Sequence, residues 1–412
     1  MEKNIKQGLI AGVSLLLSLA ATPTAWTNNV VAYENHAAVA NVSTADPCNL
    51  AVVWTLADGQ SIKGFVNVAT GLTLAADATA SVDTFGLPVH GVITLGADST
   101  LSLPSGLYLA PDATLAVGDA VDDEAILLAT GDESVIYLGG DFTLPASRTV
   151  VADGDLLTID GKGNVLAFGD DDSVIALELG TTLRMRNLTL DLTLATDSAT
   201  KSAKAKGKAT LKRAQQRSPF KIKAATGTPR VANGGGGGGG GGGDDEVPRL
   251  VFENCIIIVP PDLELGIVAN DGYLDIAGDV ILRGGGYLEI AGAGTFTIDS
   301  NSVLRIEEGS TFSFAGDSRE SFVFTDATSV LHLNNATFYS DGADGDGALF
   351  TKGTVIVEGN SRFNNGDNNN SATSIAFGDG TADNDVALKI RASATLGVAG
   401  VVDYNNVDAL AG

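Results

Sequence analysis

The sequence predicts an all-β solenoid, and two observations support this fold class. Pairs of apolar residues separated by one residue recur every six to ten positions, and a Gly, Asp or Asn turn follows each pair. Alternation in such short runs indicates many short strands and no helices. A strand this short cannot bury its apolar face alone, so stacked coils are expected. Examples are Ile93-Thr-Leu95, Leu101-Ser-Leu103, Leu288-Glu-Ile290 and Leu304-Arg-Ile306.

Internal repeats indicate the length of one coil. The segment Gly272-Tyr-Leu-Asp-Ile-Ala-Gly278 is nearly repeated fourteen residues later, and a second similarity, between Leu331 and Val355, spans twenty-four. Strand spacings of seven to ten residues and a coil of twenty-four predict about three short strands per coil. An antiparallel sandwich is the alternative, because Asp-Gly pairs such as Asp153-Gly154 also suit hairpins.

The same alternation predicts which side chains face the core, since successive residues of a strand point to opposite sides. The residues expected to point inward are Leu183, Met185, Leu274, Ile276, Leu288, Ile290, Leu304 and Ile306. Those expected to point outward are Arg184, Asp275, Glu289 and Arg305.

The first part of the chain is expected to direct export and then to cap the solenoid. In residues 1–25, Lys3 and Lys6 precede an apolar stretch that is typical of a secretory signal peptide. This stretch is shorter than the roughly 20 residues that cross a bilayer, so no transmembrane span is expected. Residues 26–60 are irregular and contain both tryptophans, which predicts a cap over the first coil.

Two stretches, 61–194 and 249–412, are predicted to form the first and second parts of one β-helix. The segment 195–248 between them breaks the pattern. It contains ten Lys or Arg residues between Lys201 and Arg230, followed by ten consecutive glycines. We expect this segment to be a disordered loop, and deletion of residues 198–248 is expected to leave folding intact. It is also a candidate polyanion-binding segment, against the alternative of a solvated linker, through Lys201, Lys204, Lys206, Lys208, Lys212 and Arg213.

Charge and cysteine content limit the possible partners. The chain has 25 Lys plus Arg against 50 Asp plus Glu, a net charge of −25. Such an acidic chain argues against nucleic-acid binding by the main body. Of the two cysteines, Cys255 lies in an apolar run and is expected to be a buried free thiol. The sequence leaves open whether Cys48 pairs with it.

A family resemblance follows from the coil motifs. Leu157-Thr-Ile-Asp-Gly-Lys-Gly, followed by Leu183-Arg-Met-Arg-Asn-Leu-Thr-Leu190, resembles the coils of right-handed parallel β-helix proteins of the pectin-lyase-like class. The resemblance covers residues 60–194 and 249–405. It implies an elongated, exported right-handed parallel β-helix and leaves the activity open, because the class includes polysaccharide lyases and hydrolases as well as adhesins.

Candidate chemistry is limited to two acidic loops. The candidate catalytic residues are Asp170, Asp171 and Asp172, which precede Arg184 and Arg186. Paired carboxylates beside arginine suit acid–base chemistry on a glycan. The alternative is that the three acids lie in a solvated turn. The motifs of pectin hydrolases, an Asn-Thr-Asp, a Gly-His-Gly and an Arg-Ile-Lys, are not found. An oxygen-rich loop supplies the calcium candidates, which are Asp341, Asp344 and Asp346.

These observations favour an exported, non-enzymatic β-helix with a structural or adhesive role at the cell surface, in the periplasm or outside the cell. The alternative is a polysaccharide lyase or hydrolase that acts on acidic glycans. Glycans or neighbouring copies of the chain are the expected partners. No cofactor is expected, with calcium as the one possible exception.

Overall fold

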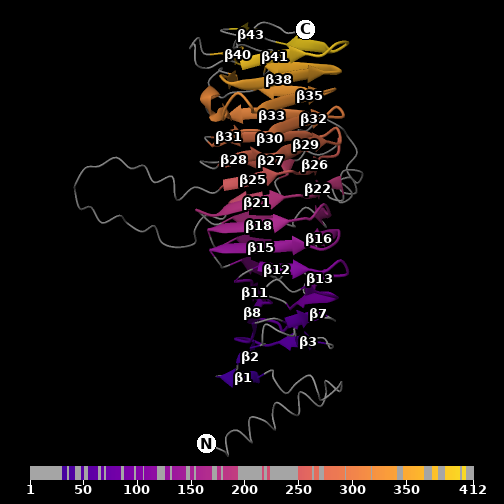
Figure 1. Ribbon diagram of the computed structural model, residues 1–412, viewed down its shortest axis with the longest axis vertical. Coiled ribbons are helices and arrows are strands. Elements are labelled where there is room, and N and C mark those ends of the chain that lie inside the picture. Colours follow the sequence, from indigo (N-terminus) through magenta and orange to yellow (C-terminus); the bar gives the residue numbers. More distant parts are fainter. Residues whose placement is uncertain are drawn as a thin grey trace, which may run out of the picture.

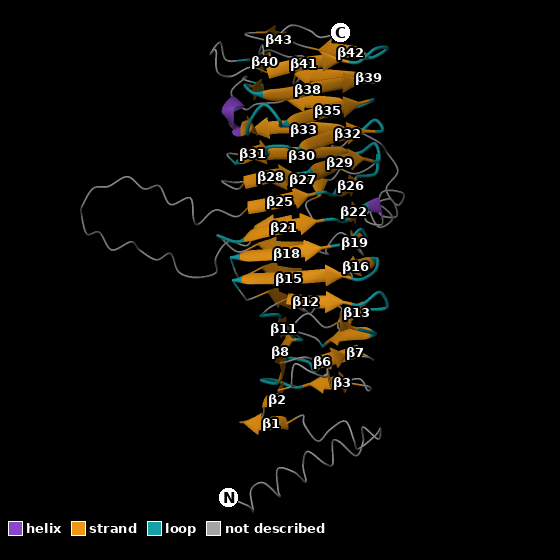
Figure 2. Ribbon diagram, in the orientation of Figure 1, coloured by secondary structure: helices purple, strands orange, loops and turns teal. Residues whose placement is uncertain are grey.

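The apolar-x-apolar runs form short strands that stack into a parallel β-solenoid, seen from the side in the computed structural model of Figure 1. Strands joined by short loops make up the stack, as Figure 2 shows by colour. No α-helix occurs in the described residues, and the 3-10 turn η3 (Arg319–Ser321) lies at the side of the stack. The structure describes residues 30–404 except for 35–36, 42–47, 51–53, 64–65, 69–70, 85–87, 97–98, 105, 118–125, 130–131, 145–148, 153–154, 169–173, 178–179, 194–215, 218–219, 223–248, 262–263, 269–272, 293, 317, 341–346, 366–373, 379–385 and 400.

The strands follow one another around three faces, and each coil contributes one strand to each face. Face 1 consists of β3 (Cys48–Leu50), β6 (Val66–Val68), β9 (Pro88–Val89), β12 (Gly106–Leu109), β15 (Glu133–Leu138), β18 (Leu156–Asp160), β21 (Thr182–Arg186), β25 (Arg249–Glu253), β28 (Tyr273–Ala277), β31 (Thr295–Ile298) and β34 (Phe322–Phe324), followed by β37 (Leu349–Phe350), β40 (Ser374–Phe377) and β43 (Val401–Tyr404).

Face 2 consists of β4 (Trp54–Leu56), β7 (Gly71–Leu74), β10 (Val92–Leu95) and β13 (Thr114–Val117), followed by β16 (Phe142–Leu144), β19 (Val165–Phe168), β22 (Thr189–Asp191), β26 (Ile256–Ile258), β29 (Asp279–Arg283), β32 (Val303–Glu307), β35 (Val330–Asn334), β38 (Gly353–Glu358) and β41 (Val386–Ile390).

Face 3 consists of β5 (Ser61–Lys63), β8 (Thr79–Asp83), β11 (Thr100–Ser102), β14 (Ile126–Ala129), β17 (Thr149–Ala152), β20 (Val174–Leu177) and β24 (Phe220–Ile222), together with β23 (Gln216–Arg217), β27 (Glu264–Val268), β30 (Tyr287–Gly292), β33 (Thr311–Gly316), β36 (Thr337–Ser340), β39 (Asn360–Asn365) and β42 (Thr395–Ala399).

The pairing confirms a solenoid and excludes the antiparallel sandwich. Every strand pair in the three faces is parallel, and the one antiparallel pair in the described residues joins β1 (Val30–Glu34) to β2 (Ala37–Asn41). Parallel neighbours need a crossover, and here the other two strands of the coil supply it. About three strands per coil, as expected from the repeat lengths, is therefore confirmed.

The predicted core is confirmed at the positions named from the sequence. All eight residues expected to point inward are buried, and they belong to one continuous hydrophobic core. Arg184, Glu289 and Arg305 are partly exposed, as expected for outward positions. Asp275 differs, because only 7% of it is exposed although it occupies an outward position. Its carboxylate pairs with Arg249 of the preceding coil.

Asparagines at the turns adopt the left-handed conformation, and each contacts the coil that follows. Asn254 has φ +53°, and its Oδ1 accepts a hydrogen bond from the Asp279 backbone N–H at 3.1 Å. A Cβ added at Gly278 would lie 2.1 Å from that Oδ1. Asn335 and Gly359 repeat this arrangement, so an asparagine turn is followed in the next coil by a glycine that leaves room for its amide.

The solenoid begins before residue 61, which is the start expected from the sequence. β3 and β4 lie in the segment expected to be a cap, yet they pair in parallel with β6 and β7. The short runs Cys48–Leu50 and Trp54–Leu56 follow the same alternation as later strands, which explains the difference. The β1–β2 hairpin precedes these coils, and β2 lies beside β5.

The segment 195–248 also differs from expectation, because it contains two strands. β24 pairs with β20, and β23 pairs with β27, so Gln216–Arg217 and Phe220–Ile222 supply face 3 strands at this level of the solenoid. Phe220-Lys-Ile222 carries the apolar-x-apolar phrase, which the surrounding charge and glycine obscured. The expectation that the segment contributes nothing to the solenoid is therefore wrong at these residues. The rest of it lies outside the described residues.

The buried thiol of Cys255 confirms the prediction made for that residue. Cys255 is a free cysteine with no exposed surface, and burial raises the pKa of its thiol to about 11. Cys48 lies in β3, seven strand steps from β25 on face 1, which is about 33 Å at the usual strand spacing. A disulfide between Cys48 and Cys255 is therefore excluded by distance.

Candidate functional site

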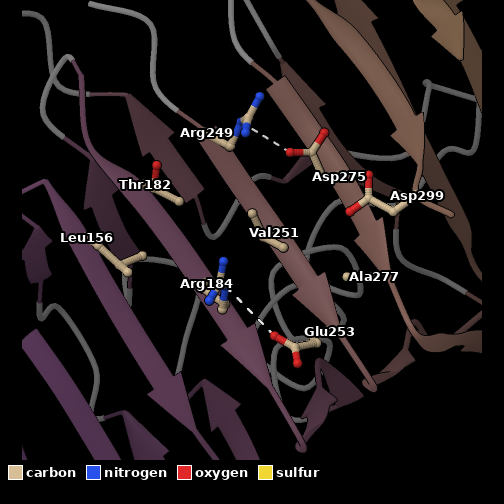
Figure 3. Close-up of a pocket in the computed structure, with 9 residues that line it drawn as sticks. All are labelled: Leu156, Thr182, Arg184, Arg249, Val251, Glu253, Asp275, Ala277 and Asp299. Carbon is tan, nitrogen blue, oxygen red and sulfur yellow. Dashed lines mark ion pairs between the residues drawn. The ribbon is translucent and has the colours of Figure 1, made fainter. Parts of the chain in front are cut away.

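A shallow groove crosses the outer side of face 1 in the middle of the solenoid (Figure 3). It has a volume of about 260 Å³ and is lined from β18, β21, β25, β28 and the turn after β31. Five consecutive coils thus contribute, because outward residues in register stand one above another along a parallel sheet. The lining residues are Leu156, Thr182, Arg184, Arg249, Val251, Glu253, Asp275, Ala277 and Asp299.

Two ion pairs run diagonally across the groove in the same direction. Arg249 Nε lies 3.1 Å from Asp275 Oδ2, and Arg184 Nε lies 3.8 Å from Glu253 Oε2. In the register of the sheet each acid lies on the next coil, two residues beyond the position opposite its arginine. Long arginine side chains reach such diagonal neighbours. The two arginines and their acids therefore hold each other in place on the floor of the groove.

Asp275 is the buried acid of the groove. Burial raises the pKa of its carboxyl group, the nearby Arg249 guanidinium lowers it, and the charge of Asp299 raises it; the net pKa lies above the ordinary value of 3.8. The two acids lie close together on adjacent coils, as Figure 3 shows, and Arg249 forms an ion pair with Asp275. The site thus holds more negative charge than its paired cation neutralises.

Two polar groups in the groove lack a hydrogen-bond partner. Nε of Arg184 is inaccessible to solvent and makes no hydrogen bond, because Glu253 at 3.8 Å lies beyond hydrogen-bond distance. The carboxylate of Asp299 has no hydrogen bond or ion pair with any side chain in the described part of the chain. Nε of Arg184 lies beneath the surface, whereas the partly exposed carboxylate of Asp299 lines the groove and offers an acceptor to a ligand.

Further down face 1 the outer side carries aromatic rings. Tyr108 and Tyr137 lie on neighbouring coils with ring centroids 6.0 Å apart, and the Lys162 ammonium lies 4.5 Å from the Tyr137 ring centroid. The guanidinium of Arg249, which lines the groove, lies 5.0 Å from the Tyr273 ring centroid. These tyrosines are partly exposed. Such rings present a flat apolar face and a hydroxyl, so they suit polar ligands with an apolar face, such as sugars.

The sequence-predicted catalytic residues are only partly brought together. Arg184 lines the groove, whereas Arg186 is engaged beside it, with Nε donating to Oδ2 of the buried Asp160 at 3.0 Å. Asp170, Asp171 and Asp172 lie outside the described residues, as do the calcium candidates Asp341, Asp344 and Asp346. The basic residues Lys201, Lys204, Lys206, Lys208, Lys212 and Arg213 also lie outside them.

Sequence reasoning missed most of the groove. Arg249, Glu253, Asp275 and Asp299 were not identified as site residues, because each is one charged outward residue among many. The signal that locates them is the register, since outward positions at equivalent places in successive coils must form one rank. No group of three or more possible metal ligands, and no helix long and apolar enough to cross a membrane, occurs in the residues that the structure describes.

Comparisons with known proteins add no further assignment. No protein-family model, curated protein or solved structure matches the chain. The fold and the groove are therefore the observations on which a function has to be based.

Proposed function

We propose that this chain is an exported, non-enzymatic β-helix that binds glycans as a structural or adhesive protein at the cell surface or outside the cell. The observation that carries the proposal is the groove on face 1. It combines fixed arginines, carboxylates and neighbouring tyrosines, the side chains that recognise sugar hydroxyls and sugar ring faces. A right-handed, pectin-lyase-like kinship and export by residues 1–25 are parts of this proposal.

The architecture supports binding to a polymer rather than to a small molecule. A parallel solenoid presents equivalent outward positions in every coil, and its stacked coils form an extended surface. The groove spans four strand steps from β18 to the turn after β31, which corresponds to about 19 Å at the usual spacing. A surface of this length accommodates several sugar units lying along the axis.

A polysaccharide hydrolase is the second candidate, and one observation favours it. Asp275 is buried, its carboxyl pKa is raised, and a second carboxylate, Asp299, lies close by. Two carboxyl groups in different environments can serve as acid and base in glycoside hydrolysis. Against this, Arg249 pairs with Asp275 at 3.1 Å and stabilises the ionised form, which cannot donate a proton. Binding without turnover is therefore the preferred proposal.

One experiment separates the two candidates. The purified protein is applied to an array of neutral, amino and acidic oligosaccharides, and each ligand that binds is then incubated with the protein. We expect retention on at least one class, with no increase in reducing ends and no unsaturated product. Turnover that is lost in the Asp275→Asn variant would establish the hydrolase instead. Absence of binding to any glycan would refute both candidates.

A further inference from the structure

Two polar side chains of the groove restrict the chemistry of its ligand. The partly exposed carboxylate of Asp299 lines the groove and accepts no hydrogen bond from a side chain in the described part of the chain. A ligand that presents a donor towards Asp299 is therefore favoured over one that does not. The Arg184 side chain is 39% exposed, so the accessible part of its guanidinium can donate to a ligand, although its Nε is inaccessible to solvent.

The balance of charge restricts the ligand further. The groove is lined by two cations, Arg184 and Arg249, and by three anions, Glu253, Asp275 and Asp299. Arg249 is already paired with Asp275, and the whole chain carries a net charge of −25. An acidic glycan would meet a net negative groove on a strongly negative protein. Repulsion of this kind disfavours polyanions and favours ligands that are neutral or positively charged.

The corner formed by Asp275 and Asp299 is the place for a positive group. The two carboxylates lie close together, Arg249 pairs with Asp275 on the side away from Asp299, and the charge of Asp299 contributes to the raised carboxyl pKa of Asp275. A cation bound there would relieve this repulsion, and it would form charge-assisted hydrogen bonds with the free Asp299 carboxylate. The hydroxyl or carbonyl oxygens of the same ligand would accept from Arg184 on the neighbouring coils.

We propose that the groove binds a polysaccharide of amino sugars with free ammonium groups, with an ammonium at the Asp275–Asp299 corner and ring or hydroxyl oxygens at Arg184. This inference rests on the proposed glycan-binding function and names its ligand class. It departs from the acidic glycans expected from the sequence, because the acids of the groove outnumber its arginines. The polymer lies along the solenoid axis, across the coils from β18 to β31.

The test compares two tetrasaccharides that differ only in N-acetylation, the glucosamine tetramer and its fully N-acetylated form, with a galacturonic acid tetramer as the acidic probe. Affinities are measured by calorimetry at about pH 6, where sugar amines are protonated. We expect the glucosamine tetramer to bind at least about tenfold more tightly than the acetylated form, since a charge-assisted hydrogen bond is lost on acetylation. The galacturonic acid tetramer should bind most weakly.

Two variants place the effect at the groove. Asp299→Asn should weaken binding of the glucosamine tetramer about tenfold and change binding of the acetylated tetramer by less than about twofold. Arg184→Gln should weaken both. Asp279→Asn is the matched control, because Asp279 is an ion-paired acid on face 2, outside the groove, and it should change neither affinity.

The outcomes distinguish failure of this inference from failure of the proposed function. Equal affinity for the glucosamine tetramer and its acetylated form would overturn the assignment of an ammonium site. An equal loss of affinity for both tetramers in Asp299→Asn would do the same. In either case the proposed glycan binding would stand. Tightest binding of the galacturonic acid tetramer would overturn the assignment of an ammonium site as well. If no tetramer binds the wild-type protein and the array also shows no binding, the proposed function itself fails.

Discussion

The two ends of the solenoid build the same coil from different side chains. From β4 to β20 the core is mainly aliphatic, with Leu, Ile, Val and Ala at nearly every inward position. From β28 to β40 phenylalanines fill the centre, and neighbouring coils place them in register, as for Phe312 with Phe338 and Phe350 with Phe377. The first of these pairs is stacked with ring centroids 5.8 Å apart, and the second lies at 5.1 Å.

This difference shows that the coil is specified by alternation and turns rather than by the identity of the core residues. A column of aromatic rings buries more apolar area per coil than small aliphatic residues do, and ring pairs add to that gain. In a solenoid each coil contacts only its neighbours, so local stability follows local packing. We therefore expect the region from β28 to β40 to resist opening more than the region from β4 to β20.

The largest effect is expected from truncating one core residue in each region. Phe338→Ala should lower the free energy of unfolding by about 4 kcal/mol, because it removes a fully buried ring that packs against Phe312, Phe322, Phe350 and Phe363. Leu101→Ala, also fully buried, should cost about 3 kcal/mol. Denaturant unfolding followed by circular dichroism measures both. A larger loss for Leu101→Ala would contradict the comparison.

A smaller effect is expected from two glycines with positive φ. A Cβ at Gly359 would lie 2.4 Å from Asn335 Oδ1, whereas a Cβ at Gly59 would meet nothing within 4 Å. Both substitutions strain the backbone by about 1 kcal/mol, and Gly359→Ala also has to displace the asparagine amide. We expect losses of about 2 kcal/mol for Gly359→Ala and about 1 kcal/mol for Gly59→Ala. Equal losses would show that the amide shifts at no cost.

The groove lies where the two regions meet, and its buried acid should make stability depend on pH. Because the folded-state pKa of Asp275 is raised, the folded state favours the protonated carboxyl group. Its contribution to stability is therefore greatest below the ordinary pKa of 3.8 and is lost as pH rises through the folded-state pKa. Asp275→Asn should gain stability relative to wild type as pH rises over that range. If the difference in melting temperature between wild type and Asp275→Asn does not change with pH, the assignment of a raised carboxyl pKa to Asp275 is refuted.

The smallest effect concerns an exposed pair in the aliphatic region. The side-chain hydrogen bond with His90, 2.6 Å from Asp112, holds the carboxyl pKa of Asp112 below 3.8. In the C-terminal region the pKa of Asp326 is lowered mainly by hydrogen bonds with Ser300 and Thr328 instead. NMR titration of the two carboxyl groups should show that His90→Gln raises the pKa of Asp112 and leaves that of Asp326 unchanged. A shift in both would indicate a global rather than a local cause.

The fold was predictable from the sequence because each coil repeats the same short-range signals. Alternation identified inward residues such as Leu183 and Ile306, and repeat lengths gave three strands per coil. Phe220-Lys-Ile222 was missed because one short phrase within a basic, glycine-rich segment carries little weight. The groove could not be predicted from the sequence because the residues that line it come from five coils. Arg184 lies opposite Val251 and next to Glu253 only because β21 and β25 pair in this register across the 195–248 segment. Long-range register of that kind is not encoded in any local pattern.

The most direct test of the account is hydrogen exchange measured by mass spectrometry, with and without the glucosamine tetramer. We expect added protection confined to peptides from β18, β21, β25, β28 and β31, where the groove crosses face 1. Strands of face 1 outside the groove, such as β6 and β40, should exchange at the same rate in both samples. Protection at those strands, or binding of the tetramer without any change from β18 to β31, would contradict the central claim that this groove is the ligand site.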